Sequence, residues 1–105
     1  MKAEYEALAK ANENSWRILF SIANVFSYNE YFKEAIQMWQ KTFDCMPKPR
    51  YTDSFEAMAQ CCVRMGDHES AVEYYKKELE LLREDWGLKY GAEVDALEEK
   101  IRALQ

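Results

Sequence analysis

Hydrophobic residues recur along most of this chain at intervals of three and four, the spacing that places them on one face of an α-helix. Two long segments carry the pattern, residues 15–46 and residues 52–84. Each segment is interrupted once, at residues 27–30 and at residues 65–67. Short polar or glycine-containing interruptions mark turns. Each segment therefore predicts two helices joined by a turn.

The ends of these segments carry start and stop signals for helices. Pro47 and Pro49 separate the two segments, because two prolines so close together end a helix. Thr52 and Asp53 are expected to cap the next helix, since their side-chain oxygens accept hydrogen bonds from free N–H groups of its first turn. Gly66 suits the position just past a helix end, where a left-handed backbone is common.

The two ends of the chain predict additional helices. A last helix is expected over residues 91–104, with apolar residues spaced 3, 4 and 3 on a single face: Val94, Leu97, Ile101 and Leu104. Residues 3–11 predict one short helix, which needs packing to be stable. Residues 85–91 are expected to form a turn. Glu84 and Asp85 are expected to lie at a solvated helix end.

The two long segments also repeat each other. Seven positions, six in the first segment and one directly after it, are matched 36 residues later. The seven positions are Leu19, Ile22, Ala23, Phe26, Ala35, Trp39 and Pro47. Their matches are Phe55, Met58, Ala59, Cys62, Ala71, Tyr75 and Arg83. The alanines allow two helix backbones to approach closely, and each hairpin leaves an apolar face that a neighbouring unit must cover.

This order of large, small and aromatic positions resembles the tetratricopeptide-repeat (TPR) family over about residues 16–84. The resemblance implies an all-α, TPR-like α-solenoid in one domain, residues 1–105. Its parts would be helix-turn-helix repeats at 16–49 and 52–85 and a capping helix at 91–104. The departures are a period of 36 in place of the usual value of about 34, Arg83 for Pro, Cys62 for an aromatic residue, and Thr42 and Glu78 for Ala.

In this family the first helix of each repeat lines a concave groove that holds an extended peptide or a partner helix. At about 100° per residue, one set of residues points away from the core stripe of those helices. The groove candidates are Arg17, Phe20, Asn24, Tyr28, Glu56, Gln60 and Arg64, with Ser27, Asp53 and Val63 beside them. Phe20 and Ala57 stand where a carboxylate-clamping subfamily carries Lys and Asn, so a chaperone-tail clamp is not expected.

The resemblance therefore implies a non-catalytic protein–protein interaction module or adaptor with a protein or peptide ligand. The alternative is a homo-oligomerisation or scaffold module, in which the chain forms a homodimer. A net charge of −5 argues against nucleic acid as a partner. The chain has no run of about 18 apolar residues, so no membrane span is expected. An odd count of three Cys favours the reducing cytoplasm.

Catalysis, cofactors and metals are not expected from the residue pattern. The soft metal ligands are three cysteines and one histidine: Cys45, Cys61, Cys62 and His68. Adjacent helical residues diverge by about 100°, so Cys61 and Cys62 are poorly placed to share one ion. A Ser/His/Asp arrangement is not expected, because the chain has a single His and no nucleophile in a recognisable context. His68 is expected to be a packing residue. A small enzyme or metal protein is the third alternative.

Overall fold

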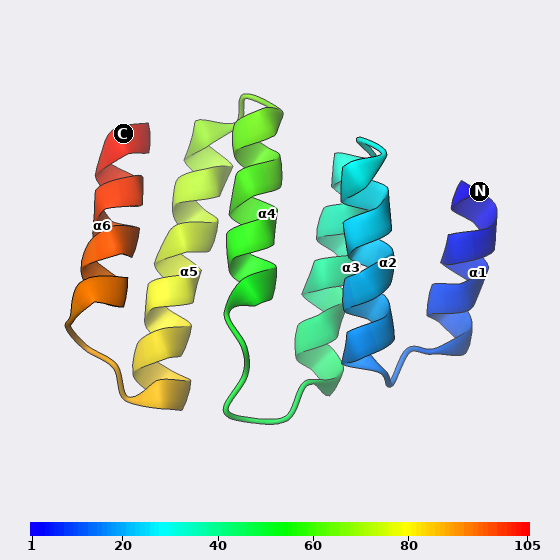
Figure 1. Ribbon diagram of the computed structural model, residues 1–105, viewed down its shortest axis with the longest axis horizontal. Coiled ribbons are helices and arrows are strands. Elements are labelled where there is room, and N and C mark those ends of the chain that lie inside the picture. The colour runs from blue at the N-terminus through cyan, green and yellow to red at the C-terminus, as the bar shows by residue number, and fades with distance from the viewer. The chain divides into compact units, whose positions relative to one another are not determined.

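The computed structural model describes residues 1–105 and contains six α-helices and no strand, which confirms the all-α prediction. The helices are α1 (Lys2–Ala11), α2 (Trp16–Tyr28), α3 (Phe32–Cys45), α4 (Asp53–Arg64), α5 (His68–Trp86) and α6 (Ala92–Leu104). They fall into two compact units, Met1–Pro47 and Lys48–Gln105, and within each unit successive helices run antiparallel (Figure 1). None of the helices is both long enough and apolar enough to cross a lipid bilayer.

The first unit is the hairpin of α2 and α3, with α1 packed against α2. Its buried side chains come mainly from the predicted stripe: Leu19, Ile22, Ala23, Phe26, Ala35 and Trp39. Met38, which the stripe did not include, is also buried. The short helix predicted for residues 3–11 is present as α1. It is fixed by Tyr5, whose ring meets Phe26 edge-on at 6.2 Å between centroids, and by an ion pair of 2.7 Å between Lys2 and Glu34.

The second unit is the hairpin of α4 and α5, with α6 packed against α5. Its buried apolar residues are Met58, Ala59, Cys61, Cys62, Ala71, Val72, Tyr75, Leu81, Leu82, Val94, Leu97 and Ile101. Three of the four stripe residues predicted for the last helix are thus buried, and Leu104 is half-buried. The last helix uses its single apolar face to cover α5.

The two hairpin turns have the same backbone hydrogen bonds, although their sequences differ. The amide of Tyr31 donates to the carbonyl of Phe26 at 2.8 Å, and the amide of Asp67 donates to Cys62 at the same distance. Glu30 and Gly66 both adopt positive φ, 66° and 80°. This six-residue arrangement is the Schellman motif, which ends a helix with a left-handed residue. The 36-residue repeat therefore extends to turn geometry.

Three local predictions need correction. The first helix of the first hairpin continues through Ser27 to Tyr28, because the Schellman motif uses these residues as its last helical turn. The second helix of the second hairpin continues to Trp86, since left-handed Gly87 ends it rather than Glu84. Thr52 holds the predicted cap position, but its backbone is helical and its side chain makes no capping hydrogen bond.

The shared turn geometry predicts how glycine and alanine rank at the two equivalent positions. We expect Gly to be more stabilising than Ala at both 30 and 66 by about 1 kcal/mol, because a left-handed backbone strains any residue with a Cβ. A Cβ at Gly66 would meet no atom within 4 Å, so the effect there is backbone strain alone. Urea unfolding of Glu30→Gly, Glu30→Ala and Gly66→Ala measures it.

Ala96, exposed inside α6, provides the matched control. In a helix interior the order reverses, and Ala96→Gly should destabilise the protein by about 1 kcal/mol. If the free energy of unfolding of Glu30→Ala equals or exceeds that of Glu30→Gly, the two turns are not equivalent in solution.

Candidate functional site

The groove candidates of the first unit lie on one face of α2, at spacings of three, four and four: Arg17, Phe20, Asn24 and Tyr28. Arg17 and Asn24 are exposed, and Tyr28 is the most open of them, with 88% of its surface exposed. Phe20 is half-buried, and its ring meets Trp39 of α3 edge-on at 6.2 Å between centroids. Phe20 therefore fills space within the hairpin, and the other three side chains face solvent.

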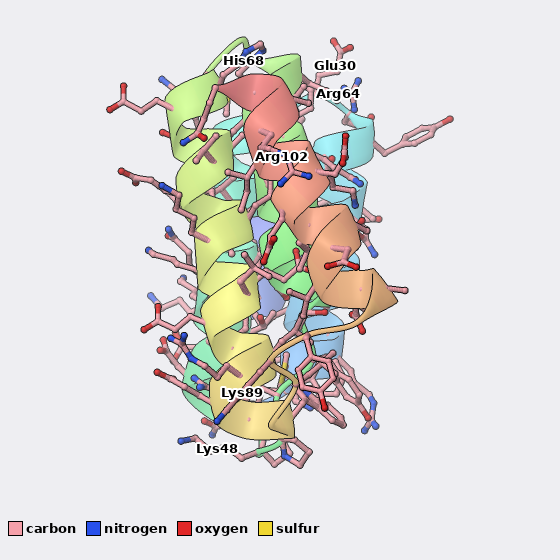
Figure 2. All side chains as sticks on the ribbon, turned by 90° about the vertical axis from the view of Figure 1, so that its left-hand side faces the viewer. Glu30, Lys48, Arg64, His68, Lys89 and Arg102 are labelled. Carbon is pink, nitrogen blue, oxygen red and sulfur yellow. The ribbon has the colours of Figure 1, made fainter.

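The candidates of the second unit lie on α4 at four-residue spacing: Glu56, Gln60 and Arg64. Gln60 and Arg64 are exposed, and Arg64 lies at the same end of the unit as His68 (Figure 2). Glu56 is half-buried and forms an ion pair of 3.2 Å with Lys100 of α6. The last helix therefore already engages one of the residues predicted to meet a ligand.

A buried carboxylic acid lies close to that ion pair. Glu78 of α5 keeps only 3% of its surface exposed, and its Oε1 atom has no hydrogen-bond partner. Burial raises the pKa of Glu78 to about 7, and the negative charge of Glu56 adds to the rise. Lys100 acts in the opposite direction, while Glu93 and Asp53 raise the pKa further. Near neutral pH, this group therefore exists in both protonation states.

An ion pair ties the segment before α4 to the end of α5. Arg50 meets Asp85 at 2.7 Å through Nε and at 3.0 Å through a terminal nitrogen, and its backbone amide also donates to that carboxylate. These hydrogen bonds hold the pKa of Asp85 at about 2. Only 1% of the Asp85 side chain is exposed, so the prediction of a solvated helix end at this residue was wrong.

The thiols and the histidine do not come together. Cys61 and Cys62 are buried, Cys45 is half-buried, and none of the three forms a disulfide. Burial raises the pKa of the Cys62 thiol to about 11, which keeps it protonated and unreactive at neutral pH. His68 is exposed at the start of α5, so the expectation that it packs was wrong. No group of three or more His, Cys, Asp and Glu side chains is arranged to hold a metal ion.

Sequence reasoning missed the cluster around Glu78, although a signal for it was present. Glu78 aligns with Thr42 in the repeat, and it follows Ala71 and Tyr75 at the spacing of the buried stripe. A charged residue within a buried stripe is the informative exception among helical positions. The partners Lys100 and Glu93 had no comparable signal, since nothing in the sequence shows which residues of α4 and α5 lie next to α6.

The comparisons with known proteins identified no relative of this chain. No protein-family model matches the chain, and a search of curated proteins also found no match.

The raised pKa of Glu78 predicts a pH-dependent stability. A carboxylic acid whose folded-state pKa exceeds its unfolded value of about 4.5 binds its proton more tightly in the folded protein. The free energy of unfolding should therefore fall as pH rises from about 4.5 to about 7 and then level off. Glu78→Gln should abolish this fall and stabilise the protein at pH 8 by about 3 kcal/mol. Urea unfolding across this pH range provides the measurement.

The matched control is Glu80→Gln, an exposed change on the same helix, which should keep the pH profile of the parent protein. A Glu78→Gln profile that runs parallel to the parent profile would show that Glu78 titrates normally.

Proposed function

We propose that this chain is a non-catalytic protein–protein interaction module of TPR-like architecture that binds an extended peptide or a partner helix. The repeat supports the architecture: both hairpins end their first helix with the same Schellman motif, and Ala23, Ala35, Ala59 and Ala71 are all fully buried. Small residues at helix contacts and equivalent turns are what a helical repeat requires.

The observation that carries the proposal is the contrast between the two faces of α2. One face is buried through Leu19, Ile22, Ala23 and Phe26, which fixes the helix within its hairpin. The opposite face presents long exposed side chains, and the Tyr28 ring is almost fully open to solvent. A rigid helix with exposed polar and aromatic side chains provides contacts at a low entropic cost of binding.

The chemistry of the candidates suits a peptide backbone and its acidic groups. Asn24 and Gln60 each carry a donor and an acceptor, the combination that pairs with a peptide group. Arg17 and Arg64 can form paired hydrogen bonds to a carboxylate of the ligand. Arg17 also lies over the Trp16 ring, with its guanidinium carbon 4.9 Å from the ring centroid. Phe20 and Glu56 support the helices through Trp39 and Lys100 and need not touch the ligand.

Homo-oligomerisation is the second candidate, and exposed apolar residues in the first unit favour it. Met1 and Leu8 of the N-terminal segment are about half exposed, and Ile18 of α2 is 36% exposed. A second copy of the chain would cover these side chains. Sedimentation at falling protein concentration separates the two functions. A dimer that persists to nanomolar concentration favours the scaffold, and a monomer excludes it.

The groove residues are tested with the double change Asn24→Ala and Arg64→Glu. A pull-down with this chain as bait supplies the partner, and calorimetry with the bound segment of that partner measures affinity. We expect affinity to fall at least about tenfold, because one hydrogen-bonding amide is lost and one charge is reversed.

The matched control is Asn14→Ala with Arg83→Glu, the same chemical changes at exposed positions outside the first helices of the hairpins. This control should bind as tightly as the parent chain. Equal affinity of the groove variant and the control would show that Asn24 and Arg64 are not part of the binding surface. Circular dichroism of both variants checks that the helices are intact.

A further inference from the structure

A second candidate binding site lies in the second unit, where α4 begins, α5 ends and α6 begins (Figure 1). The site is a hollow of about 370 Å³. Its lining combines two aromatic rings, two carboxylates and two leucines: Tyr51, Trp86, Asp53, Glu93, Leu82 and Leu88. Asp53, predicted to lie beside the groove candidates, lines this hollow, whereas Glu56, Gln60 and Arg64 do not. The variant that tests the groove, at Asn24 and Arg64, therefore leaves the lining of the hollow unchanged.

The two aromatic rings are held in place and remain accessible. Tyr51 and Trp86 lie 6.3 Å apart between ring centroids with 37° between their planes, and about half of each residue is exposed. The indole N–H of Trp86 donates to the carbonyl of Arg50 at 2.7 Å. Arg50 is itself fixed by its paired hydrogen bonds to Asp85. Fixed aromatic faces that are open to solvent attract cations.

The charges around the hollow are mainly negative. Asp53 and Glu93 lie in the first turns of α4 and α6. A helix N-terminus carries about half a positive charge, so a full carboxylate charge there leaves the helix start negative. The C-terminal end of α5 also points here, and helix C-termini favour cations. Glu78 lies one turn before the lining residue Leu82, and its buried Oε1 atom lacks a hydrogen-bond partner.

Two of the neighbouring cations of the protein are paired with other carboxylates. Arg50 is paired with Asp85, and Lys100 is paired with Glu56. Lys48 and Lys89 lie at this end of the unit (Figure 2). Lys89, however, lines a different hollow, with Lys76 and Glu98. Asp53 and Glu93 take part in neither of these ion pairs, so both can meet a cation from another molecule.

We propose that this hollow binds the guanidinium group of an arginine side chain in a partner peptide. A planar guanidinium stacks on an aromatic ring while its N–H groups donate to carboxylates at its edge, a combination that the compact ammonium group of lysine does not match. The hollow lies at the small end of the range for ligand sites, roughly 300–1,000 Å³, which suits one side chain. Leu82 and Leu88 would contact its aliphatic stem.

The test uses N-acetyl-arginine amide, which presents the side chain between two peptide groups. The ligand is titrated into the ¹⁵N-labelled chain while the Trp86 indole resonance, assigned with Trp86→Phe, is followed by NMR. We expect a saturable shift of this resonance with a dissociation constant of about 1–10 mM. N-acetyl-citrulline amide has nearly the same shape and no charge, and it should cause no saturable shift.

The double change Asp53→Asn and Glu93→Gln should weaken binding at least about fivefold. The control Glu84→Gln with Asp95→Asn removes the same charge from exposed positions outside the hollow and should bind like the parent chain. If the double variant does not fold, the comparison of the arginine and citrulline compounds on the parent chain still tests whether the hollow binds guanidinium.

Three results would overturn the assignment. Equal shifts with the citrulline compound would show that charge is not recognised. Equal affinity for N-acetyl-lysine amide would show that the hollow does not prefer a guanidinium group over an ammonium group. Tighter binding of free L-arginine than of the blocked amide would identify an amino acid rather than a peptide as the ligand. None of these results bears on Asn24 and Arg64, so the groove and this hollow succeed or fail separately.

Discussion

Two helices can pack closely only where the side chains between them are small, and four alanines meet that requirement in the two hairpins. Ala23 and Ala35 are fully buried in the first unit, as are Ala59 and Ala71 in the second. Larger buried residues on either side fill the remaining space at the density of a protein interior. The exposed faces of α2 and α4 owe their fixed position to this packing, because each helix is anchored along its opposite face.

Glu78 is the exception to that packing rule, and its consequences reach beyond the helix contact. Thr42 at the equivalent position of the first hairpin is small and fully buried. Glu78 brings a carboxyl group into the same kind of position, where Glu56 and Lys100 surround it and one oxygen lacks a partner. A local rule broken without an evident structural gain is where function is most often found. The charges of Glu93 and Asp53 also act on this group and raise its pKa.

The sequence contained enough to predict the helices but not their partners across the fold. Helix positions follow from the spacing of apolar residues, and even the weakly supported helix of residues 3–11 is present. The end of α5 was misplaced because Gly87, and not the acidic pair before it, supplies the left-handed residue. The ion pair of Arg50 and Asp85 and the hollow beside Trp86 join residues about 35 positions apart. No local pattern specifies such contacts.

The ion pair between Arg50 and Asp85 also affects how the second unit opens. Helix ends usually fray, so their amide protons exchange with solvent well before those of the core. Here the last turn of α5 is bound to the segment that leads into α4, and the Schellman motif connects the same two helices at their other end. Both ends of the hairpin are thus held by contacts, and we expect its last turn to open together with the hairpin rather than before it.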